Sequence, residues 1–212
     1  MRLSSTMAPS CQVRKQEEIV VIGITGGVGC GKSTVVGMLE EKYGAKVLIA
    51  DDIGHEAMEP GSATYEKICT AFGTGILRED NTIDRKQLAD IIYGSDEKRK
   101  CLNDMIHPFV FRTMEERLRQ WQKEPLVVIE TAILFETGCD RLCHRIWCVT
   151  AGKECRIRRL SEARGYTREK SEAIMAKQMG EEEMRRHCDV VIYNDGDFKK
   201  LENQLQELLG IK

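Results

Sequence analysis

Residues 26–34 read GGVGCGKST and follow directly on the apolar run IVVIGIT. A strand-like run, a glycine-rich turn with the spacing G-x-x-x-x-G-K-S and a helical pattern after it form the context in which this motif binds phosphate. The glycines let backbone N–H groups turn toward one point, and the positive end of the following helix adds to their attraction for an anion. The stretch predicts a nucleotide-binding loop, rather than a turn that only joins a strand to a helix.

The side chains of this loop have distinct expected parts. The Lys32 amine can reach the β- and γ-phosphates, and the Ser33 hydroxyl can coordinate Mg²⁺. Cys30 is interpreted as a tolerated small residue, because the turn does not require a thiol at that position. The residues expected to contact the nucleotide are Gly26, Gly27, Val28, Gly29, Cys30, Gly31, Lys32, Ser33 and Thr34.

The bulk composition favours one globular domain with small-molecule partners. The chain has 212 residues, 42% of them hydrophobic, and a net charge of −2, which gives no sign of nucleic-acid binding. No apolar run approaches the roughly 18–20 residues that a membrane crossing needs. Nine cysteines without a framework spacing, in a chain without a signal sequence, predict reduced thiols, no metal cluster and a cytoplasmic location.

Short apolar runs alternate with longer segments of helical period. The expected strands are residues 19–24, 45–49, 126–129, 145–149 and 190–193, and helical patterns begin at residue 32 and cover 198–209. Nearly continuous Val, Ile and Leu in such runs is typical of strands that are covered on both faces of a parallel sheet. The alternation predicts a doubly wound α/β fold.

Two intervals interrupt this alternation and set the expected domain organisation. Residues 1–18 are interpreted as a disordered leader, and residues 19–212 as one domain with its core at 19–51 and 125–212. A helical insertion at about 52–124 is expected to bind the acceptor, with helices at 65–72, 85–93 and 97–121, the last interrupted at Pro108. A basic helical pair at about 151–180, broken near Gly165, is expected to form a lid.

The remaining patterns narrow the class of phosphate chemistry. The chain lacks the Asn-Lys-x-Asp element of GTPase switches and the Leu-Ser-Gly-Gly-Gln signature of transporter ATPases. A compact core with a helical insertion and a basic segment suits a small-molecule kinase, which must enclose ATP and its acceptor to keep water away from the γ-phosphate.

An ordered series of motifs then resembles the dephospho-CoA kinase family, from about Ile19 to the C-terminus. The series is GITGGVGCGKSTV, ADDIGHEAMEPG, IDRKQLADIIY with the following IHP, IETAILFETG, RIRRL, Gln178 and CDVVIYNDG. The resemblance implies a three-layer P-loop NTPase fold and ATP with Mg²⁺. It also implies phosphorylation of the 3′-hydroxyl of dephospho-CoA to give CoA and ADP, the last step of coenzyme A biosynthesis. No obligate protein partner is evident from the sequence.

Two carboxylates carry the expected chemistry. Asp51 follows the second strand, where a carboxylate can accept the proton of an attacking hydroxyl, although a helix N-cap is the alternative. The family has Asp-Ala-Asp where this chain has Ile49-Ala50-Asp51, so Asp51 alone inherits the role of base, and Asp52 is expected to be a cap or first-turn anion. Glu130, where the family usually has Asp, is expected to bind Mg²⁺ through water and to lie near the substrate.

The other site residues follow from the resemblance. Arg159 matches the lid arginine that would balance charge on the transferred phosphoryl group. Arg85, after the expected cap Asp84, is a candidate for a phosphate of the acceptor. His107 either contacts substrate or forms a structural corner, because Pro108 disfavours helical geometry before it. Asn194 is expected near the adenine.

Two alternative functions remain open at this point. A nucleoside or nucleotide kinase would use the same core with a different insertion. A protein whose nucleotide regulates a binding partner would need the phosphate loop but no carboxylate aimed at an acceptor.

Overall fold

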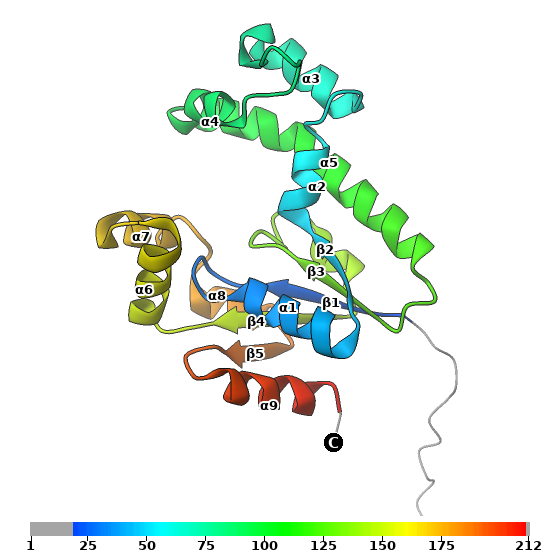
Figure 1. The fold of residues 1–212 in the computed structure, drawn as a ribbon, viewed down its shortest axis with the longest axis vertical. Coiled ribbons are helices and arrows are strands. Elements are labelled where there is room, and N and C mark those ends of the chain that lie inside the picture. Colours follow the sequence, from blue (N-terminus) through cyan, green and yellow to red (C-terminus); the bar gives the residue numbers. More distant parts are fainter. Residues whose placement is uncertain (1–18, 211–212) are drawn as a thin grey trace, which may run out of the picture.

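A computed structural model describes residues 19–210 and contains one five-stranded parallel sheet (Figure 1). The strand order is β2-β3-β1-β4-β5. The strands are β1 (Val20–Thr25), β2 (Lys46–Ile49), β3 (Leu126–Glu130), β4 (Arg145–Thr150) and β5 (Val190–Tyr193). The predicted parallel α/β fold is confirmed, with strand ends within one residue of those expected, and the predicted leader lies outside the described residues.

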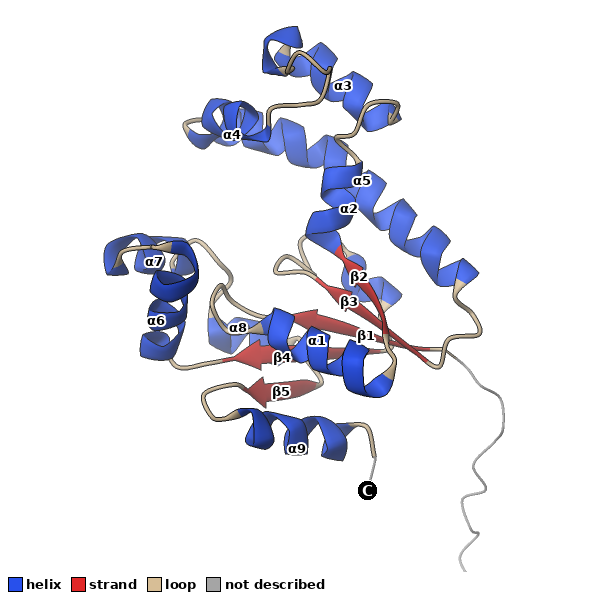
Figure 2. Ribbon diagram, in the orientation of Figure 1, coloured by secondary structure: helices blue, strands red, loops and turns tan. Residues whose placement is uncertain are grey.

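Helices cover both faces of the sheet, which gives three layers (Figure 2). On one face, α1 (Lys32–Tyr43) and α9 (Phe198–Leu208) pack on alternate residues of the central strands, such as Ile22 and Val128. The intervening residues, such as Val21 and Val127, face α2 (Ala50–Glu56) and the C-terminal half of α5 (Asp96–Gln120). Because both sides of these strands are buried, their sequences are continuously apolar.

A second group of helices extends away from the sheet above the ends of β2 and β3 (Figure 1). It contains α3 (Ala63–Phe72), the short turn η1 (Thr74–Ile76), α4 (Arg85–Tyr93) and the N-terminal half of α5. These elements have their own apolar cluster around Ile68, Leu88 and Leu102. The predicted cap of α4 is confirmed, since the Asp84 carboxylate accepts hydrogen bonds from the N–H groups of Lys86 and Gln87.

The predicted break at Pro108 is wrong. Helix α5 runs from Asp96 to Gln120 without interruption, and Pro108 lies inside it on the exposed side. Leu102 is buried among the outlying helices, whereas Val110 and Met114 are buried against the sheet. Packing at both ends therefore holds one continuous helix, at the cost of the backbone hydrogen bond that proline cannot donate. His107 is consequently helical and forms no corner.

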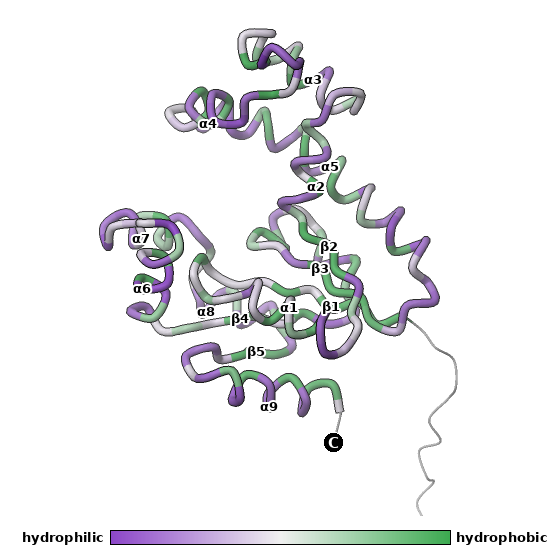
Figure 3. The backbone as a smooth tube through the Cα atoms, in the orientation of Figure 1, coloured by the Kyte–Doolittle hydropathy of each residue, from purple (hydrophilic) through white to green (hydrophobic). Residues whose placement is uncertain are grey.

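The basic segment forms two helices that contact each other beside the phosphate loop. They are α6 (Lys153–Arg164) and α7 (Arg168–Met175), followed by α8 (Glu181–Arg186) against β4. Hydrophilic residues dominate α6 and α7 (Figure 3). Arg168 of α7 donates two hydrogen bonds to Glu154 of α6, at 2.9 and 2.6 Å. No helix within residues 19–210 combines the length and the apolar character that a membrane crossing requires.

Candidate nucleotide and acceptor site

The P-loop, residues 26–34, joins β1 to α1 in a conformation that its glycines permit. Gly29 and Gly31 have φ angles of 76° and 89°, in the left-handed region that residues with a Cβ atom rarely adopt. A Cβ atom on Gly31 would also collide with the side-chain amide of Asn194. Glycine at position 31 is therefore needed twice, for its backbone angles and for the approach of the loop that follows β5.

The P-loop presents a set of donors without protein acceptors. Among the described residues, the N–H groups of Gly29, Gly31, Lys32 and Ser33 have no hydrogen-bond acceptor. The N–H groups of the first turn of a helix lack intrahelical partners, and this clustering at one helix start makes an anion site. The Lys32 ammonium lies in the same loop and donates to the Gly26 carbonyl at 3.0 Å.

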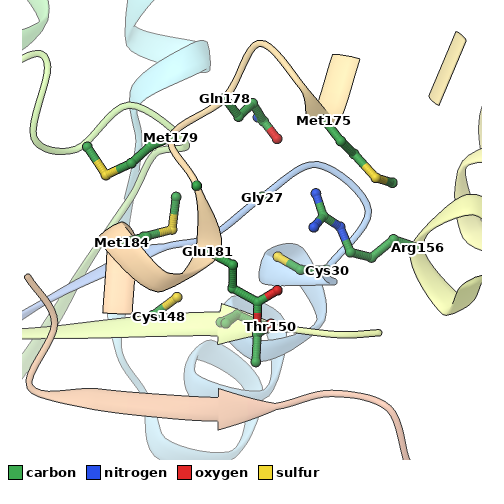
Figure 4. Close-up of a pocket in the computed structure, with 12 residues that line it drawn as sticks. Gly27, Cys30, Cys148, Thr150, Arg156, Met175, Gln178, Met179, Glu181 and Met184 are labelled. Atoms are coloured by element: carbon green, nitrogen blue, oxygen red, sulfur yellow. Dashed lines mark hydrogen bonds between the residues drawn. The ribbon is translucent and has the colours of Figure 1, made fainter. Parts of the chain in front are cut away.

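The lid segment holds one peptide of the P-loop from both sides. The Val28 N–H donates to Oε1 of Gln178 at 2.8 Å, and Nε of Arg156 donates to the Val28 carbonyl at 2.8 Å. Figure 4 shows Arg156 and Gln178 on the edge of a small cavity of about 80 Å³ beside Gly27. The sequence marked Arg156 only as one of several basic residues, and Gln178 only as part of the motif series. Their shared contact with Val28 depends on the fold.

Glu130 and Lys32 meet at the ends of two neighbouring strands. The strand register pairs Glu130 of β3 with Ile24 of β1, so the carboxylate lies beside the P-loop. Lys32 Nζ is 3.7 Å from Glu130 Oε1, and the two side chains are 13% and 14% exposed. Burial raises the pKa of Glu130; Lys32 opposes this shift, and the negative charge of Asp51 adds to it. Burial thus disfavours the charged form of this carboxyl group, and Lys32 offsets part of that cost.

A first cavity, of about 380 Å³, lies on the Glu130 side of α1. Its lining includes Ser33, Asp52 and Glu130, which carry side-chain oxygen atoms, together with Ile49 and Arg117. Carboxylate and hydroxyl oxygens are the ligands that Mg²⁺ prefers. Asp52 lies in the first turn of α2, as expected of a first-turn anion, but it shares this cavity with both predicted metal ligands. Within residues 19–210, no three His, Cys, Asp or Glu side chains group closely enough to hold a metal ion.

A second cavity, of about 230 Å³, lies between α2, α5 and the loop after β3. Asp51, His107 and Thr131 line it together with apolar residues such as Ile106 and Ile133. Burial lowers the pKa of His107, so its imidazole is neutral at pH 7. The alternative reading of Asp51 as a cap is wrong: the cap position of α2 is Ile49, and Asp51 is an exposed residue of the first turn.

A third cavity, of about 190 Å³, lies on the opposite side of the P-loop. It is lined by Thr34, Arg159, Asn194, Gly196, Phe198 and Leu201. Asn194 is buried and donates from Nδ2 to the Cys30 carbonyl at 2.9 Å. The two terminal nitrogens of Arg159 donate to the carbonyls of Cys30 and Asn194, at 3.3 and 2.7 Å.

The structure therefore brings most of the predicted site residues around the P-loop, where they line the small cavity beside Gly27 and the three larger cavities. Arg85 is the exception, because it lies exposed in the first turn of α4 and lines none of these three cavities. Cys30 is buried within the loop, and its burial raises the pKa of the thiol. A protonated, enclosed thiol agrees with its interpretation as a small packing residue.

A family model and curated relatives of this chain point to the same family. A family model described as dephospho-CoA kinase matches residues 20–200. The dephospho-CoA kinase of Geobacter sulfurreducens is 37% identical over 190 residues, which cover 89% of this chain and 96% of that relative.

Solved structures agree with this match. A crystal structure from Thermus thermophilus has a TM-score of 0.78 at 34% identity and covers 91% of this chain and 97% of its own. The dephospho-CoA kinase from Campylobacter jejuni has a TM-score of 0.67 at 25% identity, with 90% and 97% of the two chains covered. The family match extends from the first strand to α9, and the chain belongs to the dephospho-CoA kinase family.

Proposed function

We propose that this protein transfers the γ-phosphoryl group of ATP to the 3′-hydroxyl of dephospho-CoA and so produces CoA and ADP. Family membership supports the substrates. The observation that carries the chemistry is the position of Asp51: it lines the cavity under α5 and lies close enough to Glu130, beside Lys32, to influence its charge. A candidate base, an acceptor cavity and a phosphate-binding loop thus meet at the ends of β2, β3 and β1.

The P-loop supplies the binding site for the triphosphate. The unpaired N–H groups of Gly29, Gly31, Lys32 and Ser33 can donate to phosphate oxygens without breaking any bond among the described residues. Two contacts hold the Lys32 ammonium, a hydrogen bond to the Gly26 carbonyl and the ion pair with Glu130, and from this position it can reach the β- and γ-phosphates. The donors are positioned in advance, so little of the binding energy is spent on ordering them.

Ser33 and Glu130 fit a Mg²⁺ ion that accompanies ATP. Both line the cavity on the Glu130 side of α1, and the cavity is large enough for water between Glu130 and the ion. When bound, the ion would neutralise charge on the phosphate oxygens. Asp52 contributes a further carboxylate to this cavity, where Ile49 has replaced the first acid of the family pattern.

The acceptor hydroxyl is placed in the cavity of Asp51. As the hydroxyl oxygen bonds to the γ-phosphorus, the bond from that phosphorus to the β–γ bridging oxygen breaks, and the hydroxyl proton passes to the Asp51 carboxylate. His107, neutral in this cavity, can form a hydrogen bond with the acceptor without adding charge. Arg85 lies in α4 and does not line the cavity of Asp51, so its contact with the acceptor stays a prediction.

Arg159 requires a movement to act on the transferred group. Its guanidinium is bound to the carbonyls of Cys30 and Asn194, on the far side of the P-loop from Asp51. We therefore place Arg159 and Asn194 with the nucleotide. Charge balance by Arg159 on the phosphoryl group would accompany a change of the lid. The cytoplasmic location and the absence of an obligate protein partner stay predictions from the sequence.

A coupled ADP-release assay with dephospho-CoA, adenosine and nucleoside monophosphates tests the function. Turnover stimulated by dephospho-CoA alone is the expected result, and the Lys32→Ala variant is the matched control that should lose it. Stimulation by a nucleoside or nucleoside monophosphate instead would indicate a kinase of another acceptor class. ADP release that ignores all acceptors would contradict the proposal and favour a nucleotide-regulated binding protein.

A further inference from the structure

Residues 27–30 of the P-loop form a tight turn. The Cys30 N–H donates to the Gly27 carbonyl at 3.3 Å, which closes a four-residue β-turn with Val28 and Gly29 at its centre. Gly29 has a φ angle of 76°. Among residues 19–210 Asn81 is the only non-glycine residue with a positive φ, so the φ angle of Val28 is negative. A negative φ followed by a positive one identifies a type II turn.

The central peptide group of such a turn has two accessible orientations. It consists of the Val28 carbonyl and the Gly29 N–H, which point in opposite directions because the peptide group is planar and trans. A type I turn presents this group the other way round, and glycine at position 29 tolerates the φ angles of both turn types. The sequence of the turn therefore does not decide which side the Gly29 N–H faces.

Arg156 of α6 selects one of these orientations. Its Nε donates to the Val28 carbonyl at 2.8 Å, so the carbonyl faces α6 and the Gly29 N–H points away from this helix. The approach is close, because a Cβ atom on Gly27 would collide with the Arg156 guanidinium beside it (Figure 4). A Cβ atom on Gly29 would lie 2.9 Å from the Arg156 carbonyl. Helix α6 thus fits against the turn at two glycines.

The Gly29 N–H stays available to a ligand, whereas the N–H before it does not. The Val28 N–H donates to Gln178 at 2.8 Å, but the Gly29 N–H has no acceptor among the described residues. The unpaired N–H groups of Lys32 and Ser33 are oriented by the first turn of α1. Gly29 precedes that helix, so the orientation of its N–H depends on the hydrogen bond from Arg156.

We propose that Arg156 is a positioning residue for phosphoryl transfer: its Nε holds the Val28 carbonyl so that the Gly29 N–H faces the phosphates of ATP. This inference rests on the proposed binding of the triphosphate by the P-loop, and it assigns part of that binding to a residue of α6. The donor at Nε is what positions the turn, and the positive charge of Arg156 is not required for it.

Two neutral substitutions of Arg156 separate the donor from the charge. Nε2 of glutamine is as many bonds from the backbone as Nε of arginine, whereas methionine has a similar length and no donor. Nitrogen–proton correlation NMR follows the amides of Gly29, Lys32 and Ser33 as inorganic tripolyphosphate with Mg²⁺ is added to saturation. We expect a downfield shift of the Gly29 proton in the wild type and Arg156→Gln, and its loss in Arg156→Met. The Lys32 and Ser33 protons should shift in all three proteins.

Calorimetry with the same ligand measures the size of the effect. Loss of one hydrogen bond to a charged phosphate predicts a Kd for tripolyphosphate about ten-fold weaker in Arg156→Met than in Arg156→Gln. Arg158→Ala is the matched control, because Arg158 carries the same charge on the same helix and is exposed. It should leave the Gly29 shift and the affinity for tripolyphosphate unchanged.

Three results would overturn the proposal. One is a Gly29 shift at saturation that persists in Arg156→Met. Another is an equal loss in Arg156→Gln and Arg156→Met, which would mean that the charge of Arg156 supports the site. The third is a Gly29 amide that does not respond to tripolyphosphate in the wild type, while Lys32 and Ser33 do. None of these measurements uses dephospho-CoA, so failure of this inference and failure of the proposed phosphoryl transfer give different outcomes.

Discussion

The substitution Glu130→Gln should make the ligand-free protein more stable and the enzyme less active. Glu130 is 14% exposed at the end of β3, and its pKa is raised mainly by burial and further by the charge of Asp51. A raised pKa means that the folded state favours the protonated form of the carboxyl. Glutamine resembles that neutral form in shape and removes the cost of holding a charge at this position.

The magnitude follows from two opposing contributions. At 3.7 Å, the attraction between Lys32 and Glu130 is roughly 4–5 kcal/mol at an effective dielectric constant of about 20. The raised pKa shows that desolvation and repulsion by Asp51 together exceed this attraction. Removing an unfavourable charge commonly stabilises a protein by about 0.5–2 kcal/mol, so we expect Glu130→Gln to stabilise this protein at pH 8 by on the order of 1 kcal/mol. For a chain of this length that is a rise in Tm of about 2–4 °C.

The pH dependence of stability tests independently whether Glu130→Gln raises or lowers the free energy of unfolding. Between the ordinary pKa of a glutamate and the raised pKa of Glu130, the folded protein holds a proton that the unfolded chain has released. The stability of the wild type therefore falls relative to Glu130→Gln as pH rises through this window. In acid below the ordinary range both side chains are neutral, and the advantage of the variant should disappear.

Thermal unfolding of both proteins across this pH range measures the effect, with Glu207→Gln, at an exposed position of α9, as the matched control. ADP release at increasing Mg²⁺ should show a loss of activity of about 10–100-fold in Glu130→Gln, since the substitution removes the outer ligand that we propose for the ion. A variant less stable than the wild type at pH 8, or a stability gain that persists unchanged in acid, would refute the reasoning about Glu130.

Three further substitutions test other parts of the structure. Asp51→Asn should lower kcat by about 100-fold or more while the Kd of ATP stays unchanged, because it removes the proposed base, which lies outside the P-loop. Normal single-turnover rates would exclude Asp51 as the base. Leu205→Ala should lose about 2–5 kcal/mol in urea unfolding, because Leu205 is fully buried between α9 and the sheet, and a loss below about 1 kcal/mol would contradict that packing. Pro108→Ala should gain up to about 3 kcal/mol in the same assay, because alanine restores a backbone donor inside α5 at an exposed position. A loss of stability would mean that the proline ring is needed there.

Much of the fold could be predicted because its signals are local. The glycine-rich loop between an apolar run and a helical pattern fixed the β1–P-loop–α1 unit, and the continuous apolar runs of the other strands followed from burial on both faces. Asp84 capped its helix as expected, because an N-cap depends on a few neighbouring residues. The ordered series of motifs predicted the dephospho-CoA kinase family, and the comparisons confirm this prediction. The roles of individual site residues and the division into core, insertion and lid stay predictions.

Predictions from the local preferences of single residues were wrong where contacts between residues far apart in the chain were stronger. Pro108 was expected to end a helix, but apolar contacts on both sides of it, to the outlying helices and to the sheet, keep α5 continuous. Asp51 was a possible cap, but α2 begins directly after β2, so the carboxylate falls in the first turn of the helix. In both cases the preference of one residue is small compared with the burial of the apolar residues around it.

The sequence alone determined that this chain binds phosphate between a strand and a helix, because that property depends on residue types within nine consecutive positions. Only the tertiary structure decided which distant side chains complete the site. Gln178 and Arg156 lie 150 and 128 residues from Val28, and they hold its peptide from both sides. Asp51 and Asp52, adjacent in the chain, face different cavities. The order and register of the five strands set these contacts, and strand order is a result of how the whole core packs.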